Sequence, residues 1–425
     1  MGRASDLFYN SMAIDDIAET KISSKKSISY TDNIADVLVT PIYMYQSVPL
    51  TTNLGTVTKY IQMIRSEVLD NSSTICGTHS IDNNGVVWGW GLNDDGQVGN
   101  NTSTSIIYSS PVTIASSKTF NQIIRTERSL CALDSSGFAW CWGYNYDSGI
   151  CGINDSTIYR ISSPVSVVGG TQFVTGGGPF INTITMLNIS GFAWGWGLNA
   201  VGQIGDGTIL NRSSPVSVMG GINFVAISGS MGIDTNNNVW AWGFSNYGRI
   251  GDGTLQNRSS PVAVIGIGST NNIVKIVSSD ATSLMLTSDG YCYACGQGGY
   301  VGDNTANNRS SPVSVVGGYK FKQIATNGYS SFGLDDTGQA WAWGTNAHGE
   351  LGDGTVQNRS SPVQVKQGTR KFAKISSDIC SSAIDMDGNI WVWGTVPWTP
   401  RGGPGDINCS YPCLLAGSLK GVVNY

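Results

Sequence analysis

Trp196-Gly-Leu-Asn-Ala-Val-Gly-Gln-Ile-Gly-Asp-Gly-Thr208, followed by Arg212-Ser-Ser-Pro-Val216, is the stretch that decides the fold, because the chain repeats it. The first mark of the repeat is W-x-W-G. Six copies keep both tryptophans, and a further copy carries Tyr293 and Cys295 in their place. The intact pairs are Trp88/Trp90, Trp140/Trp142, Trp194/Trp196, Trp240/Trp242, Trp341/Trp343 and Trp391/Trp393.

The second mark is S-S-P, which one copy alters to Ser410-Tyr-Pro412. The successive prolines lie 53, 51, 46, 51, 50 and 50 residues apart, a regularity typical of tandem structural repeats. They are Pro111, Pro164, Pro215, Pro261, Pro312, Pro362 and Pro412. The chain therefore carries seven copies of a repeat about fifty residues long.

One copy shows what each repeat builds. Its apolar runs predict strands at Phe224–Ile227, Met231–Asp234 and Val239–Gly243, and a fourth strand after Pro261. Four short strands without a helical period are typical of a propeller blade. The sequence thus predicts an all-β fold: a seven-bladed β-propeller of four-stranded antiparallel blades over residues 46–425, with a short N-terminal extension over residues 1–45.

The tryptophans predict how the blades pack. Two aromatic residues two positions apart point to one face of a strand, and the residue between them is small or modest in every copy. The bulky face of one blade can then fill the space beside the flat face of the next, with each buried aromatic contributing about 2–3 kcal/mol. The copy with Tyr293 and Cys295 is expected to make the weakest contact.

The sequence also predicts a strand that helps to close the ring. Ser47-Val-Pro-Leu50 precedes Tyr60 by nearly the interval that separates Pro111 from Phe120, so it reads as an eighth, degenerate copy of the S-S-P strand. An extra strand near one terminus can clasp the first and last blades of a ring. We therefore expect Ser47–Leu50 to take part in closure.

The string from Trp196 to Val216 resembles the regulator of chromosome condensation repeat family, whose consensus has the same W-G-x-N-x-x-G-Q-L-G core and a later P-x-x-V. The resemblance covers roughly residues 47–425. It implies a seven-bladed propeller that binds proteins through loops on one ring face. Members include a guanine-nucleotide exchange factor on chromatin, a plant photoreceptor and a secreted bacterial inhibitor. The near-identical copies here look most like bacterial or viral members.

Composition excludes several classes of function. Charged residues make up 12% of the chain and the net charge is −5, with no basic block beyond Lys21, Lys25 and Lys26, so no nucleic-acid partner is expected. No run of 18 apolar residues predicts a membrane span, and the N-terminus lacks the apolar core of a signal peptide. The nine cysteines are odd in number and mostly replace small residues of other copies. They are read as buried thiols, although Cys409 and Cys413 are close enough to pair.

Catalytic and metal sites find little support. His79 and His348 lie in different repeats, and Cys292 and Cys295 have no second pair for a zinc site. The G-D-G-T loops offer one carboxylate each, too few for calcium. They are read as turns that Asp and Thr side chains cap, with the following arginine, such as Arg212, bracing each turn. We expect no enzyme activity, no metal and no cofactor.

Segments that break the repeat are the better candidates for binding, since shared positions serve the ring. One is Thr175–Asn182, which contains Phe180. The other is Thr395–Pro404, which contains Trp398, the tryptophan outside the blade motif, and Arg401. Trp and Arg are favoured interface anchors. The alternative is that the second loop merely packs on the last blade.

The N-terminal segment lies outside the repeats and is too short to fold alone. We expect residues 1–45 to anchor the chain to a subunit of a larger assembly, while the propeller binds a surface receptor or another protein. A phage or virus particle fits the low charge and near-identical copies, which places the chain on a virion or extracellular surface. The alternative is a cytoplasmic regulator, such as a guanine-nucleotide exchange factor for a small GTPase.

Overall fold

The computed structural model describes residues 43–52, 55–64, 78–81, 84–91, 93–103, 108–126, 128–180, 182–267, 271–377, 380–387, 389–396 and 407–414. Every named element within these ranges is a β-strand, which confirms the all-β class. None of them forms a helix with the length and apolar character that a membrane span requires. The predicted extension, residues 1–45, lies almost wholly outside the described residues, and β1 (Tyr43–Thr52) crosses its predicted end.

From β3 (Thr78–Ile81) onward the strands pair antiparallel into seven consecutive sheets, each of which is one blade. The first three sheets hold β3 (Thr78–Ile81), β4 (Val87–Gly91) and β5 (Tyr108–Thr113); β6 (Phe120–Arg125), β7 (Ser129–Asp134), β8 (Ala139–Tyr144) and β9 (Arg160–Ser166); and β10 (Phe173–Phe180), β11 (Thr183–Asn188), β12 (Ala193–Gly197) and β13 (Arg212–Ser217). The next two hold β14 (Phe224–Ser228), β15 (Met231–Asp234), β16 (Val239–Gly243) and β17 (Arg258–Ala263); and β18 (Ile273–Ser278), β19 (Thr282–Thr287), β20 (Cys292–Gly296) and β21 (Arg309–Ser314). The last two hold β22 (Phe321–Thr326), β23 (Ser330–Asp335), β24 (Ala340–Gly344) and β25 (Arg359–Gln364); and β26 (Phe372–Ser377), β27 (Cys380–Asp385), β28 (Ile390–Val396) and β29 (Ile407–Leu414).

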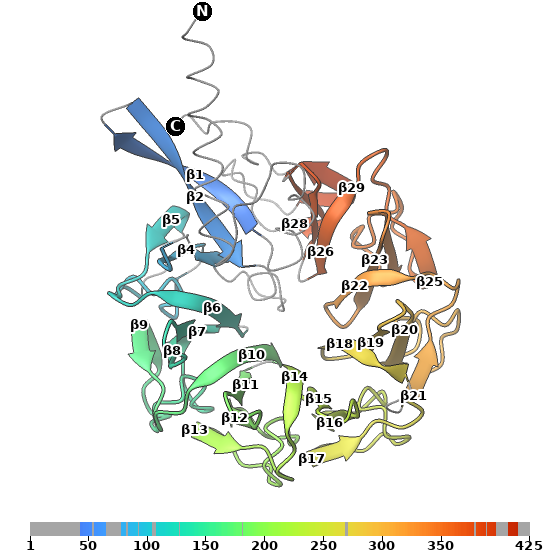
Figure 1. Cartoon of the computed structure of the whole chain (residues 1–425), viewed down its shortest axis with the longest axis horizontal. Coiled ribbons are helices and arrows are strands. Elements are labelled where there is room, and N and C mark those ends of the chain that lie inside the picture. The colour runs from blue at the N-terminus through green and yellow to red at the C-terminus, as the bar shows by residue number, and fades with distance from the viewer. Residues whose placement is uncertain are drawn as a thin grey trace, which may run out of the picture.

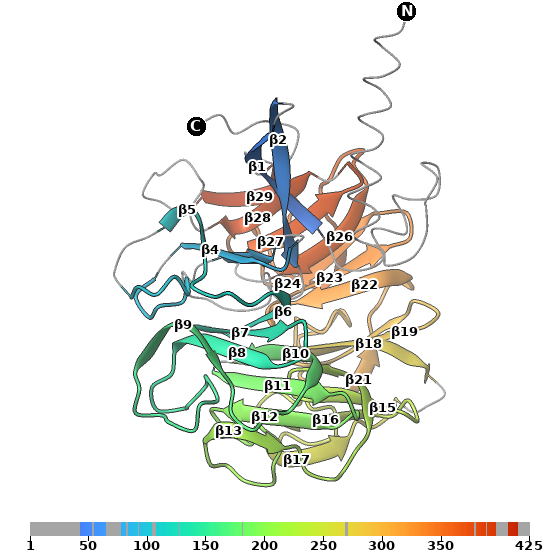
Figure 2. The ribbon, with the colours of Figure 1, turned by 60° about the vertical axis from the view of Figure 1, so that its left-hand side comes forward.

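These sheets stand around a common centre, which confirms the seven-bladed ring (Figure 1). The first strand of each four-stranded sheet, such as β10, β14 or β18, lies nearest the centre, and the fourth lies at the rim. Figure 2 shows the sheets following one another face to face. Within the described residues the first sheet has three strands rather than four.

One face of the ring carries two connections from each of the four-stranded blades. Because the strands alternate in direction, the turn between the first and second strands and the loop between the third and fourth lie on the same side; we call it the loop face. Hydrogen bonds join the two connections. Thr183 Oγ1 donates to the oxygen of Leu198 at 2.7 Å, and Ser330 Oγ donates to the oxygen of Thr345 at 2.8 Å.

The second tryptophan of each motif joins neighbouring blades, as predicted from the spacing. Trp242 is fully buried and packs with Leu187, Ala193 and Val218 of the preceding sheet. It lies against Gly205, where an added Cβ would come within 2.9 Å of the indole nitrogen. The small residue at this point of the loop is therefore a packing requirement as well as a turn requirement.

In four blades the first tryptophan of the motif bonds within its own blade. Trp240 Nε1 donates to Asp234 Oδ2 at 2.9 Å, and Asp234 Oδ1 also accepts the main-chain N–H of Asn238 at 2.8 Å in the tight turn. Three other blades repeat the indole–carboxylate bond, with Trp140 on Asp134, Trp341 on Asp335 and Trp391 on Asp385. One residue thus fixes the turn and the other fixes the neighbouring blade.

The fourth strand of each blade begins earlier than predicted. Strand β17 begins at Arg258, so Pro261 lies inside it rather than before it. The register with β16 shifts between Ala241 and Gly243, which marks a bulge at this rim strand. Proline is tolerated there because a bulge on an edge strand does not need its N–H for the ladder.

The expectation that Ser47–Leu50 clasps the first and last blades is wrong for the described residues. The segment lies in β1, which pairs with β2 (Gly55–Ile64) in a hairpin of its own, with Ser47 opposite Tyr60. The last sheet takes its fourth strand, β29, from its own repeat. A hairpin closed by a very short connection costs far less chain entropy than a strand exchanged between termini.

The blade with Tyr293 and Cys295 keeps a reduced version of the contact. Cys295 is fully buried, and its Sγ donates to the main-chain oxygen of Arg249 in the preceding blade at 3.3 Å. Arg249 is itself buried, with Nη1 donating to the oxygen of Ser279 at 2.6 Å and to Ser278 Oγ at 3.2 Å. Burial lowers the pKa of this guanidinium to about 10, which leaves it charged at neutral pH.

Candidate functional site

The residues proposed from the sequence as binding anchors are not brought together by the described structure. Phe180 ends β10 at the loop face, whereas Trp398 and Arg401 lie outside the described residues. The glycine-rich run before Phe180 has a packing role. An added Cβ on Gly177 would lie 3.0 Å from the main-chain nitrogen of Gly229 in the next blade. These three anchors stay predictions.

The G-D-G-T loops are the braced turns that the sequence predicted. Asp252 Oδ1 accepts the N–H and the hydroxyl of Thr254 at 2.9 and 2.8 Å, and Arg258 Nε donates to Asp252 Oδ2 at 2.7 Å. The blades that hold Asp206, Asp303 and Asp353 repeat the pair with Arg212, Arg309 and Arg359. Each of these carboxylates is saturated by its own loop, so these turns serve the fold.

Metal-ligating residues do not gather in the part of the chain that the structure describes. No three or more His, Cys, Asp or Glu side chains there are placed to hold one ion. Cys292 and Cys295 are both buried and belong to different core clusters on the two sides of their sheet. Burial raises the pKa of each thiol to about 12, so neither is a reactive thiolate at neutral pH.

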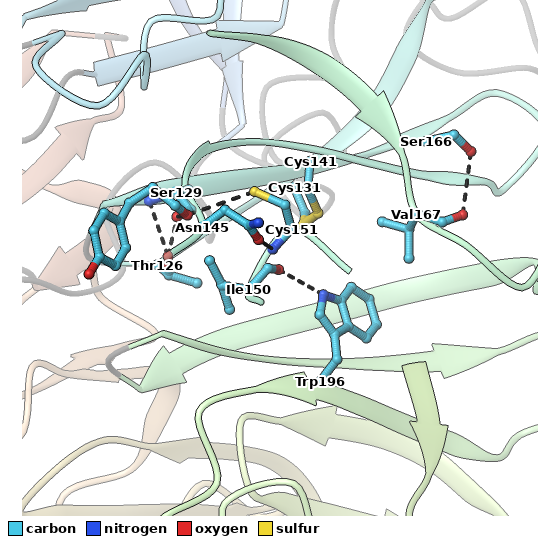
Figure 3. Close-up of a disulfide and its surroundings, with 11 residues drawn as sticks. Thr126, Ser129, Cys131, Cys141, Asn145, Ile150, Cys151, Ser166, Val167 and Trp196 are labelled. Carbon is cyan, nitrogen blue, oxygen red and sulfur yellow. Dashed lines mark hydrogen bonds between the residues drawn. A yellow bond between two sulfur atoms is a disulfide. The ribbon is translucent and has the colours of Figure 1, made fainter. Parts of the chain in front are cut away.

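The reading of all cysteines as separate thiols is wrong for one pair. Cys131 on β7 and Cys141 on β8 form a disulfide between directly paired positions, with Cα atoms 4.1 Å apart. Figure 3 shows it beside Cys151, which stays a free and buried thiol. The hairpin that turns at Gly137 places the two residues opposite each other, and its register was the signal in the sequence. Cys409 and Cys413 are free thiols here.

A group of aromatic and arginine side chains lies on the loop face of the second blade. We call it the Tyr–Arg cluster: Arg128, Tyr144, Tyr146, Tyr159 and Arg160. The Tyr144 and Tyr159 rings meet edge to face at 5.4 Å between centroids, and Tyr146 lies 5.4 Å from Tyr159. The Arg128 guanidinium carbon lies 4.5 Å from the centre of the Tyr144 ring, and that of Arg160 lies 4.8 Å from the centre of the Tyr159 ring.

A buried carboxylate from the first blade holds the cluster. The Asp95 side chain is 1% exposed; Arg128 Nη2 lies 2.5 Å from its Oδ2, and Arg160 Nε lies 3.3 Å from its Oδ1. Burial alone would lower the pKa of Arg128, but the Asp95 carboxylate outweighs it and raises that pKa. Arg128 therefore stays charged, and the two ion pairs join the first two blades.

The outer surface of the cluster remains open to solvent. Tyr146 is 48% exposed and Tyr159 is 43% exposed, and the Arg160 side chain is 43% exposed. Tyrosine and arginine are the residue types that dominate binding energy at protein interfaces. Half-exposed, mutually stacked side chains of these types form a preorganised contact surface.

A second tyrosine group occupies the loop face on the opposite part of the ring. Tyr300 and Tyr329 come from neighbouring blades and meet edge to face at 5.9 Å, and Tyr329 is 50% exposed. Burial, then the neighbouring phenols of Tyr329 and Tyr247, raise the pKa of Tyr300. The three tyrosines thus lie together across three successive blades.

Sequence reasoning missed both tyrosine groups, although a signal was present. Tyr144 and Tyr146 stand where the next copy has Leu198 and Ala200. Comparing copies at matched positions would have marked them as departures from the repeat. Asp95 was harder to find, because its partners come from another blade.

Comparisons with known proteins agree with this architecture. The model of the regulator of chromosome condensation (RCC1) repeat matches residues 84–125, 236–286 and 337–380, and a second model of that repeat matches residues 321–350. The chain is similar to yeast RCC1 (Prp20) in its crystal structure with Kap60, at 19% identity over 84% of this chain and 93% of that chain, with a TM-score of 0.63.

Two further solved structures are similar over most of their length. Prp20p from Saccharomyces cerevisiae, described with its binding to Gsp1p and histones, is 21% identical over 83% of this chain and 94% of that chain, with a TM-score of 0.63. Human WBSCR16 is 17% identical over 78% of this chain and 94% of that chain, with a TM-score of 0.65. At these identities the structures show the shared fold. The repeat matches and the seven-bladed ring together show a β-propeller that contains RCC1 repeats.

Proposed function

We propose that this propeller is a non-enzymatic binding protein whose loop face receives a partner protein. The observation that carries the proposal is the pair of half-exposed tyrosine groups on that face, around Tyr159 and Tyr329. The connections that surround them are rich in Ser, Gly and Asn. This mixture of rigid aromatic anchors and small polar residues is the composition of surfaces that bind proteins through loops.

Photo-crosslinking tests this assignment. A benzophenone amino acid is placed at Tyr146 or Tyr329 on the loop face, and at Asn236 on the opposite face as the matched control. Exposure to an extract of the source cells should give a discrete protein adduct from the loop-face positions alone. Adducts from Asn236 alone would move the site to the other face, and no adduct from any position would contradict a binding function.

The finer form of the proposal is display on a larger assembly such as a phage or virus particle, with residues 1–45 as the anchor. It is supported by the low content of charged residues, 12%, and by the near-identical repeat copies. Deleting residues 1–45 should abolish incorporation into the particle and leave a folded ring. Normal incorporation of the shortened chain would contradict this form of the proposal.

A cytoplasmic regulator of a small GTPase is the second candidate. The similarity to Prp20p, whose structure is described with its binding to Gsp1p, favours it. An exchange assay that follows release of a fluorescent guanine nucleotide from a panel of small GTPases separates the two candidates. Accelerated release by this chain would support the regulator, and unchanged release would favour the display protein.

A further inference from the structure

We propose that the Tyr–Arg cluster is a subsite for an acidic side chain of the partner, presented beside an apolar residue in an extended protein segment. The inference rests on the proposed binding function of the loop face and names the chemistry that one part of that face recognises. It is carried by the way Asp95 holds Arg128 and Arg160.

The two guanidiniums are fixed before any partner arrives. Asp95 is buried between the first two blades and touches both arginines, while Tyr144 and Tyr159 lie against the guanidinium faces. Ordering a long side chain at an interface normally costs conformational entropy. This cost is already met in the free protein, so a ligand at the cluster binds preorganised donors.

The buried carboxylate cannot satisfy both arginines. Two guanidiniums carry about ten N–H donors, whereas one carboxylate has about four lone-pair positions. Asp95 approaches Nη2 of Arg128 and Nε of Arg160, and both side chains remain about four-tenths exposed, at 37% and 43%. The outer edges of the guanidiniums therefore present donors to solvent, in the planar geometry that matches a carboxylate.

The charges around the cluster favour an anion of limited size. Arg128 and Arg160 outnumber the single buried carboxylate of Asp95. Asp147 is the other acidic residue beside Tyr144, and it is exposed, so water and salt screen its charge. A nucleic acid needs a long basic surface, which this chain of net charge −5 does not offer. One or two carboxylates of a protein segment fit this charge.

The tyrosines determine what accompanies the carboxylate. Tyr146 and Tyr159 stand beside Arg160 with about half of their surface exposed, 48% and 43%. A wholly apolar segment would cover the arginine donors without replacing their hydrogen bonds, which is costly. An acidic residue with an apolar neighbour suits both the arginine and the tyrosines. Its carboxylate accepts hydrogen bonds from Arg160, and the apolar neighbour covers the rings of Tyr146 and Tyr159.

The test uses two fluorescein-labelled octapeptides of sequence Glu-Pro-Glu-Leu-Glu-Pro-Glu-Leu and Gln-Pro-Gln-Leu-Gln-Pro-Gln-Leu, with the full chain titrated by fluorescence anisotropy. We expect the Glu peptide to bind at least about tenfold more tightly than the Gln peptide, since charge-assisted hydrogen bonds to arginine are lost in the latter. Equal binding of the two peptides up to millimolar protein overturns the proposal.

Matched variants assign the binding to the cluster. Arg160→Gln leaves Asp95 paired with Arg128 and should weaken the Glu peptide about tenfold. Its control is Arg258→Gln, because the Arg258 side chain is also partly exposed, at 31%, but its guanidinium is paired with Asp252. Tyr159→Ala should weaken binding, whereas Tyr291→Ala, which removes a ring stacked with Lys320 on the other face, should not. Equal losses in cluster and control variants overturn the assignment.

A further variant separates a loss of peptide binding from a loss of folding. Arg160→Lys keeps the charge beside Asp95 and removes the planar fork, so it should retain the wild-type Tm while weakening the Glu peptide. If Lys restores full peptide binding, the cluster attracts charge without recognising a carboxylate and the proposal fails. If the wild-type chain crosslinks through the loop face but shows no preference for the Glu peptide over the Gln peptide, the proposed function stands and the acidic subsite is rejected.

Discussion

Trp242 donates its indole N–H to the main-chain oxygen of Gln203, which lies 2.9 Å away in the loop of the preceding blade. Trp142 and Trp196 make the same bond across the two preceding interfaces, to Gln97 and Ile150, both at 2.8 Å. In these three blades the second tryptophan therefore does more than fill space, because it also satisfies a carbonyl in the loop between the third and fourth strands of the preceding blade. Within the described residues, the buried indole nitrogens of Trp343 and Trp393 make no such hydrogen bond.

The first prediction separates these two roles. Trp242→Phe keeps most of the ring and removes the donor, leaving the Gln203 oxygen unsatisfied, so the free energy of unfolding should fall by about 1–3 kcal/mol. Trp242→Ala should cost about 3–5 kcal/mol, because the ring is lost as well. Urea denaturation followed by tryptophan fluorescence measures both. Equal losses would mean that the ring adds nothing beyond the hydrogen bond, and an unchanged stability of Trp242→Phe would mean that the hydrogen bond adds nothing to the packing.

The second prediction concerns the blade in which Cys295 replaces that tryptophan. A thiol buries little area, and its bond to the Arg249 oxygen, 3.3 Å long, is weak. Cys295→Ala should therefore cost about 1 kcal/mol, well below Trp242→Ala. The same denaturation measurement compares them. A loss at Cys295 as large as that at Trp242 would show that this interface is not the weakest of the ring.

The sequence was sufficient to predict the seven blades and insufficient to predict the Tyr–Arg cluster, and the reason is physical. Strand spacing and turns such as the one at Asn237 are local consequences of one repeat, so each copy indicates them again, and six copies carry the tryptophan pair. Asp95 meets Arg128 and Arg160 only after two blades have packed, and no pattern within one copy encodes that meeting. The Cys131–Cys141 disulfide lies between these two cases in how readily the sequence predicts it, because it follows from the register of one hairpin.

The third prediction concerns acid stability. Burial alone would raise the pKa of the Asp252 carboxyl, but hydrogen bonds from Thr254 and Arg258 outweigh it and hold that pKa below its ordinary value. The carboxyls of Asp206 and Asp353 are held low in the same way. Because the folded pKa is depressed, the stabilisation is complete above the unfolded pKa, about 3.9, and is lost as pH falls through the folded pKa.

A chain with all three residues changed to Asn should therefore lose less stability on acidification than the wild type. Urea midpoints measured between about pH 5 and pH 2 should converge as pH falls, with the variant less stable at the upper end and nearly equal at the lower end. Parallel curves for the two proteins would show that these carboxylates titrate alike in the folded and unfolded states.

The fourth prediction concerns the disulfide between Cys131 and Cys141, which closes a short hairpin inside the second blade. Restricting the unfolded chain over a separation of 10 residues is worth about 2–3 kcal/mol in the chain-entropy model. A reductant added to the unfolded protein should therefore lower the refolded stability by about that amount. Cys131→Ala/Cys141→Ala should do the same without reductant, and Cys151→Ala, beside the pair, is the matched control.

Peptide mapping checks the covalent bond itself. When the oxidised chain is unfolded and alkylated without reductant, Cys131 and Cys141 should escape modification, whereas Cys151, Cys292 and Cys295 should be alkylated. Alkylation at both Cys131 and Cys141 would show that they are thiols. The stability change on adding reductant should then vanish, because in the chain-entropy model it comes only from a crosslink that restricts the unfolded chain.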